Sequence, residues 1–269
     1  MSFGGPSRSS CRAEGRGTLA AREAAPYLAP MTDQTGRDGV LLLHGLGTGA
    51  QGVTMRPLAR RLTAAGFAPV CLDYPSSRMD IDGARRWLGP RIAEASARFD
   101  RCHLVGHSLG GVLAARLACE VEERRRGRIV QLGAPNLGSP LAALALRVPP
   151  AARVLGPALH DLARGPSPCA TQGIGAIAGR TSWGPPARLP GGLGAPFTGA
   201  SDGKVSVASA LAGADDTLIL PIGHAFLPLS RRVAEATVRY LQEGRFGPGS
   251  AAVVPSHGAE PKAHADIHA

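Results

Sequence analysis

The sequence predicts an α/β fold with a mainly parallel sheet and helices on both faces. From Gly39 onward, short apolar runs that are typical of buried strands alternate with segments of helical periodicity, and this alternation indicates strand–helix–strand units. The chain has 269 residues, of which 44% are hydrophobic, enough for one sizeable core. We therefore expect a single domain over residues 36–243, a disordered arm over 1–35 and a disordered tail over 244–269.

The expected elements follow in a regular order as far as residue 133. Leu58 and Leu62 share one face of the first helix, Asp73 closes the second strand, and Pro90 can kink the second helix. After an interruption, two further strands and a last helix complete the fold. We expect strands at 40–43, 68–72, 102–105, 128–132, 174–178 and 217–221, and helices at 55–65, 81–99, 109–122 and 228–242.

The interruption indicates a small helical cap or lid over residues 137–173. Two short apolar helices, over 141–147 and 153–163, are separated by Pro149 and Pro150. They would lie over the carboxyl ends of the strands, and the alternative is an ordinary subdomain that packs on the core. The loop over 184–200, rich in glycine and proline, is also expected near the entrance. The candidates for lining an acyl pocket are Leu141, Leu144, Leu146, Val154, Leu155 and Leu159.

The net charge of +10 does not indicate a nucleic-acid partner. Only 4% of the residues are aromatic, so side chains that could stack on bases are scarce. The densest basic cluster is Arg124, Arg125, Arg126 and Arg128. We expect it to end the helix that begins near Ser108, where positive charge favours the negative end of the helix dipole.

The sequence also limits the chemistry and the compartment. Five cysteines without a CxxC pair argue against a disulfide framework, and Cys71, Cys102 and Cys119 are expected inside core elements. The tail histidines match no metal-site spacing, so we expect neither a metal nor an organic cofactor. No run reaches the ~18 apolar residues of a membrane span, and the start of the sequence has no apolar signal core. A cytoplasmic protein is the expectation.

One motif indicates a serine nucleophile. The stretch from Val105 to Gly111 reads Val-Gly-His-Ser-Leu-Gly-Gly and fits GxSxG with Ser108 at its centre. In this motif the serine lies in a sharp turn between a strand and a helix, where side chains at positions 106 and 110 would collide with their neighbours. Glycine removes both Cβ atoms, and the expected strand before the turn and helix after it support the assignment.

A serine nucleophile needs a base to take its proton and an acid to orient that base, in the chain order serine, acid, histidine. His224 opens the loop after the last expected strand and is the predicted base, ahead of His160 and the tail histidines. Asp202 is the predicted acid, because Gly203 permits a tight turn and Val205 leans on the core. The other candidates for the acid are Asp215, Asp216 and, more remotely, Asp73.

The oxyanion of an acyl-transfer reaction needs backbone donors. We expect one from the N–H of Leu109, directly after the nucleophile, and a second from Leu46 in the segment His44-Gly45-Leu46-Gly47. His44 precedes Ser108 and is expected to support this loop through hydrogen bonds. His107 is expected to be a neighbour of the nucleophile and not the base.

Taken in order, segments 44–47, 106–111, 133–140 (Gly-Ala-Pro-Asn-Leu-Gly-Ser-Pro), 201–205 (Ser-Asp-Gly-Lys-Val) and 223–224 resemble the α/β-hydrolase superfamily, and within it the lipase-like esterases. The resemblance covers about residues 38–243. It implies an acyl-enzyme on Ser108, with His224 as base, Asp202 as its orienting acid, and the amides of Leu46 and Leu109 as the oxyanion hole.

The expected activity is therefore that of a serine carboxylic ester hydrolase on apolar acyl esters or lipids. A secretion signal, usual in bacterial lipases that act on external fat, is not recognisable, which weakens a triacylglycerol substrate. A thioesterase, amidase or acyltransferase would use the same residues. A catalytically silent binding module is the alternative from another class, and the sequence gives no oligomeric state.

Overall fold

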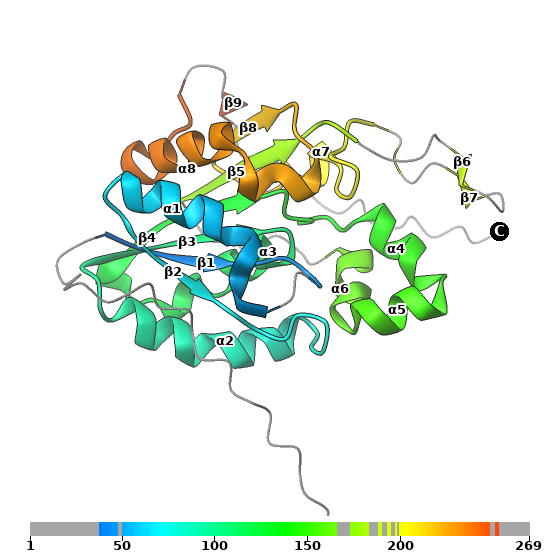
Figure 1. The fold of residues 1–269 in the computed structure, drawn as a ribbon, viewed down its shortest axis with the longest axis horizontal. Coiled ribbons are helices and arrows are strands. Elements are labelled where there is room, and N and C mark those ends of the chain that lie inside the picture. The colour runs from blue at the N-terminus through cyan, green and yellow to red at the C-terminus, as the bar shows by residue number, and fades with distance from the viewer. Residues whose placement is uncertain are drawn as a thin grey trace, which may run out of the picture.

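The computed structural model describes residues 38–47, 50–165, 173–182, 188–189, 193–194, 197, 199–247 and 251–252. Its main sheet has the strand order β2-β1-β3-β4-β5-β8-β9, in which the first six strands are parallel and β9 is antiparallel (Figure 1). The bounds are β1 Asp38–Leu43, β2 Ala68–Leu72, β3 Arg101–His107, β4 Arg126–Leu132, β5 Ile174–Gly179, β8 Asp216–Leu220 and β9 Ala251–Ala252. The predicted α/β class with a mainly parallel sheet is confirmed.

Alternate residues of the strands pack on opposite faces of this sheet, as the two-residue period of a strand requires. Leu41 and Leu43 of β1 face a core formed with α2 (Ile81–Ser96) and α3 (Leu109–Arg116). Val40 and Leu42 face a second core formed with α1 (Arg56–Ala64) and α8 (Arg231–Glu243). Figure 1 shows α1 and α8 on one side of the sheet and α2 on the other. Burial on both faces explains the continuous apolar runs of the strands.

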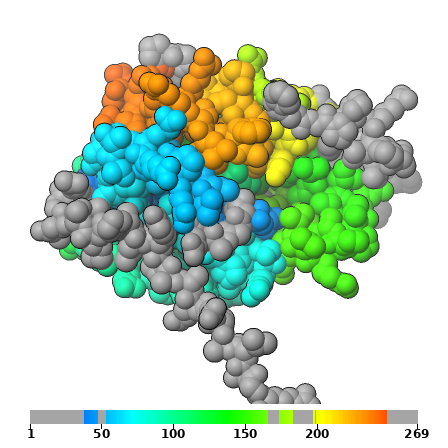
Figure 2. All heavy atoms as spheres, in the orientation of Figure 1, coloured from blue at the N-terminus to red at the C-terminus, as the bar shows by residue number. Residues whose placement is uncertain are grey.

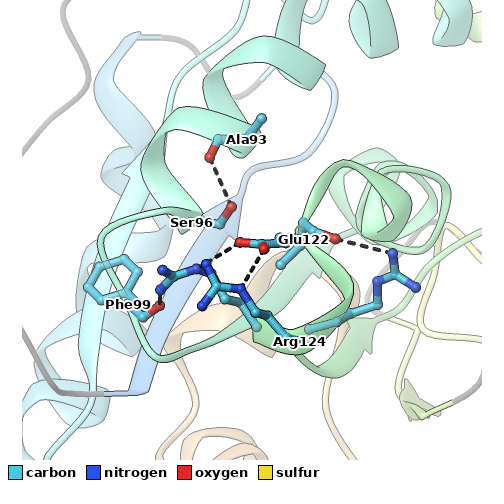
Figure 3. Close-up of polar contacts among 8 residues, drawn as sticks. Ala93, Ser96, Phe99, Glu122 and Arg124 are labelled. Atoms are coloured by element: carbon cyan, nitrogen blue, oxygen red, sulfur yellow. Dashed lines mark hydrogen bonds and ion pairs between the residues drawn. The ribbon is translucent and has the colours of Figure 1, made fainter.

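The arginine cluster does not end the helix after Ser108, so that expectation was wrong. α3 stops at Arg116 and is followed by two 3-10 turns, η2 (Ala118–Glu120) and η3 (Glu123–Arg125). Glu122 accepts hydrogen bonds from Arg124 and from Arg125, and Arg125 also donates to the carbonyl of Phe99 in the turn after α2 (Figure 3).

A different helix benefits from this cluster. The Arg128 guanidinium donates to the carbonyl of Leu241 at 2.6 Å and to that of Gln242 at 3.3 Å, in the last turn of α8. These carbonyls have no acceptor role inside their own helix, so the charge of Arg128 stabilises the negative end of a dipole that lies more than a hundred residues away in sequence.

The insertion contains three helices where two were expected. They are α4 (Pro140–Leu146), α5 (Pro149–Leu155) and α6 (Ala158–Arg164), and together they form the cap (Figure 1). Pro149 and Pro150 do not separate helices; they occupy the first turn of α5, where proline is favoured. Gly156 ends α5 with φ +80, and a Cβ there would lie 1.8 Å from the carbonyl oxygen of Ser77. In the space-filling view the cap is a lobe beside the segment that begins at residue 200 (Figure 2).

The remaining described elements are η1 (Ala50–Met55), α7 (Val207–Leu211), η4 (His224–Leu229) and a small antiparallel pair, β6 (Arg188–Leu189) with β7 (Leu193–Gly194). Most of the loop over 184–200 and the arm over 1–35 lie outside the described residues. Within the expected tail, Phe246 is buried and its ring lies 4.7 Å from that of Tyr240. None of the helices in the described ranges is long and apolar enough to cross a membrane.

Two of the three cysteines expected in core elements are buried. Burial raises the pKa of Cys71 to about 11 and that of Cys102 to about 12, so both stay protonated thiols at neutral pH. Cys119 is exposed, contrary to expectation, because α3 ends before it and η2 turns its side chain outward. Cys11 and Cys169 lie outside the described residues.

Candidate active site

Ser108 occupies a strained turn between β3 and α3. Its φ of 54° and ψ of −122° make it the one non-glycine residue of the described part with positive φ, a conformation that persists only when the surroundings enforce it. A Cβ on Gly106 would lie 2.1 Å from the carbonyl oxygen of Gly110, and a Cβ on Gly110 would lie 2.3 Å from that of Leu43. The glycines on both sides of Ser108 are therefore required by contact with main chain.

Asp202 and His224 form a buried pair at the same edge of the sheet. Asp202 lies between β5 and α7, and His224 follows β8 and begins η4. The Asp202 carboxylate Oδ2 lies 2.7 Å from His224 Nδ1, and the His224 main-chain N–H donates to the Asp202 carbonyl at 2.9 Å. Since a carboxylate only accepts, the ring proton is on Nδ1 and Nε2 is left as an acceptor.

The other carboxylate oxygen of Asp202 is fixed by its own loop. Oδ1 accepts the main-chain N–H of Lys204 at 3.0 Å and that of Val205 at 2.8 Å. The side chains of Asp202 and His224 are 1% and 4% exposed, respectively. With three hydrogen bonds and little solvent, this carboxylate has one orientation, and the imidazole orientation follows from it.

Two glycines bring the main chain directly against this pair. Gly133, after β4, has φ +59, and a Cβ there would lie 3.0 Å from Asp202 Oδ2 and 3.2 Å from His224 Nδ1. A Cβ on Gly179, at the end of β5, would lie 2.8 Å from the Cβ of Asp202. The ends of two central strands thus support the Asp–His pair without an intervening side chain.

His107 connects the turn of Ser108 to the loop of His224. Its Nε2 donates to the His224 carbonyl at 3.0 Å, and the two rings are 4.7 Å apart. Burial, followed by the positive charge that His224 can carry, lowers the pKa of His107 well below its usual value. His107 is therefore neutral and supports the His224 loop through its hydrogen bond to the main chain, as a neighbour of Ser108 and not as the base.

A second His–Asp pair supports the loop that contains Leu46. His44 Nε2 lies 3.0 Å from Asp73 Oδ1, the Tyr74 hydroxyl donates to the His44 carbonyl at 2.8 Å, and the rings of His44 and Tyr74 stack at 4.4 Å. The structure thus brings Asp73, the remote candidate for the acid, to His44 and not to His224. These contacts of His44 agree with the expectation that it supports the loop through hydrogen bonds.

The other candidates hold main chain or lie elsewhere. Asp215 accepts the N–H of Ile174 at 2.8 Å, and Asp216 accepts that of Phe246 at 2.7 Å. His160 is exposed on α6, and the tail histidines lie outside the described residues. Within the described ranges, no three His, Cys, Asp or Glu side chains are grouped as they would be around a metal ion.

Ser108 and His224 line one cavity of about 140 Å³, over which the cap lies. Among the described residues, no hydrogen bond joins the Ser108 hydroxyl to the His224 ring. Catalytic hydrogen bonds are often long or poorly aligned in structures without substrate. Leu141 lines the cavity, and Leu144 is not among the described residues that do. The apolar side chains of the wall come mainly from the cap and are those of Leu46, Pro135, Leu141, Ala142, Ala145, Leu155, Leu159, Leu162 and Val205.

Leu46 lines the same cavity as Ser108, and Leu109 directly follows Ser108 in the chain. Leu109 is the first residue of α3, where a helix leaves its amides without internal partners. Across the described chain, neither the Leu46 N–H nor the Leu109 N–H has a hydrogen-bond acceptor. The assignment of these two N–H groups to an oxyanion hole stays a prediction.

Sequence reasoning missed several residues of the cavity wall. Pro135 and Ser139 belong to segment 133–140 and Lys204 to segment 201–205, both of which were noted for their resemblance only. For Lys204, the available signal was its position two residues after Asp202 in the sequence. Ala142, Ala145 and Leu162 carry no local signal, because their inward positions depend on how three short helices pack.

A parallel sheet with helices on both faces, and a serine turn and a His–Asp pair at its carboxyl edge, define the fold as that of the α/β-hydrolase class. The chain belongs to the alpha/beta hydrolase family, whose model matches residues 40–264.

Among curated proteins, the chain is similar to 2-hydroxy-6-oxo-6-phenylhexa-2,4-dienoate hydrolase of Burkholderia cepacia, with 32% identity over 113 residues, which is 39% of each chain. It is also similar to a 2-hydroxy-6-oxononadienedioate/2-hydroxy-6-oxononatrienedioate hydrolase of Burkholderia vietnamiensis, with 32% identity over 107 residues, or 37% of each chain. The chain thus matches less than two fifths of the length of these relatives.

Among solved structures, the fold is similar to that of the mature Bacillus licheniformis lipase BlEst2. The TM-score is 0.54, the sequence identity is 22%, and the match covers 74% of this chain and 94% of the lipase. At this identity the likeness concerns the fold.

Proposed function

We propose that this protein is a serine carboxylic ester hydrolase that acts on apolar acyl esters. The Ser108 hydroxyl attacks the ester carbonyl carbon while His224 Nε2 takes its proton, and the tetrahedral oxyanion forms next to the N–H groups of Leu46 and Leu109. The carbonyl re-forms, the protonated imidazole gives its proton to the departing alcohol, and an acyl-enzyme remains. In the second half of the reaction, water attacks the acyl carbonyl carbon while His224 takes its proton. Ser108 then leaves, regains a proton from the imidazole, and the carboxylic acid is released.

The observation that carries this proposal is that His224, which is held by Asp202 at 2.7 Å, lines the same cavity as Ser108. A serine hydroxyl at neutral pH is a poor nucleophile without a base whose tautomer is fixed. Asp202 fixes that tautomer, since it accepts from Nδ1 and leaves Nε2 free for the serine proton. A carboxylate with two further main-chain donors keeps this orientation through the cycle.

The shape of the cavity supports an apolar acyl group as the bound part. Leu141, Leu155 and Leu159 of the cap face the same space as Ser108, and neither the cap nor the serine turn places an acidic side chain there within the described residues. We assign the cap helices α4, α5 and α6 the role of covering the acyl chain. Contact with an apolar chain stabilises a complex by about 0.8 kcal/mol for each buried methylene.

Replacing the nucleophile tests the proposal. Ser108→Ala should lower kcat for p-nitrophenyl butyrate by at least about a thousandfold, since the residual rate comes from binding and the oxyanion donors alone. Ser96→Ala is the matched control: Ser96 is buried in α2, is not among the described residues that line the cavity, and donates to the Ala93 carbonyl (Figure 3).

A covalent probe gives a second reading. A fluorophosphonate should add to wild-type Ser108, as measured by peptide mass, and should leave Ser108→Ala unmodified. Turnover by Ser108→Ala within about tenfold of the wild type would overturn the proposal, as would labelling at another serine with full loss of activity.

A further inference from the structure

One residue of the cavity wall carries a permanent charge, and the triad chemistry does not use it. Of the described residues that line the cavity, Lys204 is the only formally charged one, and none is acidic. It is also the only lysine in the described part of the chain. The other polar side chains of the wall, those of His107, Ser108, Ser139 and His224, carry no permanent charge.

The backbone of Lys204 is held firmly at this position. Its N–H donates to Asp202 Oδ1 at 3.0 Å, and its carbonyl accepts the Ser139 hydroxyl at 2.6 Å. Val205, the next residue, is buried. The side chain thus starts from a fixed point between the acid and the first residue before α4, and only its four methylenes are adjustable.

The charge of Lys204 acts inside the site. The pKa of His107 is lowered by burial first, then by His224, and the Lys204 charge adds to this lowering. Within the described residues, the ammonium group has no ion pair and no hydrogen-bond partner. Its side chain is exposed, so water solvates the ammonium group until a substrate enters.

We propose that Lys204 binds an anionic group of the substrate, so that the natural ester is an anionic amphiphile. Its apolar chain would pack on Leu141, Leu155 and Leu159, and a carboxylate or phosphate would lie against the Lys204 ammonium. This inference rests on the proposed ester hydrolysis and names its substrate class. The displacement of water by the substrate strengthens the attraction, because the effective dielectric constant of the covered site is lower than that of bulk water.

Matched ester pairs that differ only in charge test this inference. For the acyl side, p-nitrophenyl hexanoate is compared with mono-p-nitrophenyl adipate, which adds a terminal carboxylate. For the alcohol side, the butyrate of 4-hydroxybenzamide is compared with that of 4-hydroxybenzoate. For a phosphate, 1,2-dihexanoylglycerol is compared with its 3-phosphate. The measured quantity is the ratio of kcat/KM for the anionic member to that for the neutral member.

In at least one pair, Lys204→Gln should lower this ratio about fivefold or more, the size expected of one partly exposed ion pair. Lys204→Glu should lower it further, and Lys204→Arg should restore it to within about twofold, because arginine keeps the charge. The wild-type ratio should also fall at high ionic strength. Arg60→Gln, which removes an equal charge from the exposed face of α1, should leave the ratio unchanged.

The pair that responds identifies the anion and the side of the ester that carries it. Equal ratios for wild type and Lys204→Gln in all three pairs at low ionic strength would overturn the inference, and Lys204 would then be a solvated surface lysine. The failure of the proposed function is a separate result, because it would appear as hydrolysis of the neutral esters by Ser108→Ala.

Discussion

Replacing Asp202 by asparagine should disable the proposed base without removing a side chain. In the native site Oδ1 accepts two main-chain N–H groups, from Lys204 and Val205, and Oδ2 accepts from His224 Nδ1. An asparagine oxygen can replace only one of these acceptors, and the two main-chain donors will claim it. The amide nitrogen then faces Nδ1 and donates to it, so the ring proton moves to Nε2, where it blocks transfer from Ser108.

The expected effect of Asp202→Asn is a decrease in kcat of about 10⁴, or about 5 kcal/mol in the activation free energy at about 1.4 kcal/mol per factor of ten. The assay is p-nitrophenyl butyrate hydrolysis at saturating substrate, with urea unfolding to verify that the variant is folded. Asp215→Asn is the matched control, since an amide oxygen can still accept the Ile174 N–H. A loss below about tenfold in a folded Asp202→Asn protein, or an equal loss in Asp73→Asn, would refute the reasoning.

Two further predictions concern the cap and the pH dependence of stability. Leu155→Trp should lower the preference for long over short p-nitrophenyl esters by about tenfold or more, because Leu155 lines the cavity, whereas Val154→Trp should not, since Val154 is 73% exposed. A shared change in both variants would contradict the assigned acyl wall. Burial lowers the pKa of His103 to about 4, and its Nδ1 accepts the Arg128 N–H at 2.8 Å. The unfolded state therefore binds more protons between about pH 6.5 and pH 4, and the free energy of unfolding should fall by up to about 3 kcal/mol as the pH drops through this window. Urea unfolding at about pH 7 and pH 4.5 measures the effect, and His103→Gln should show a smaller difference unless the assignment is wrong.

Local sequence was sufficient for the parts of the site that depend on short-range geometry. Gly106 is needed because a Cβ there would strike the Gly110 carbonyl oxygen within the same turn, and that requirement is visible in five residues. Gly110 belongs to the same motif, although the main chain that its Cβ would strike is that of Leu43 in β1. Asp202 and His224 could be nominated because each follows a strand that ends at the same edge of a parallel sheet. Their contact is present in the structure, and their roles stay a prediction.

The rest depended on contacts between distant segments. The Arg128 charge supports α8 and not α3, because the strand that carries it lies beside the end of a helix from the other end of the domain. The second cap helix, α5, ends at Gly156, where a Cβ would strike the Ser77 carbonyl oxygen, a contact that periodicity cannot reveal. Lys204 reads as part of a turn in the sequence, and only the packing of α4 beside it makes it part of the cavity.

The glycines behind Asp202 and His224 have a consequence for redesign. Main chain from the ends of β4 and β5 lies directly against the pair. Even a methyl group would therefore collide with the Asp202 carboxylate at Gly133, and with the Asp202 Cβ at Gly179. The cap covers the cavity with leucine and alanine side chains, which can be exchanged with less effect on the Asp202–His224 pair. Mutant libraries aimed at new substrates should therefore vary the cap side chains, whereas Gly133 and Gly179 should be kept in every variant.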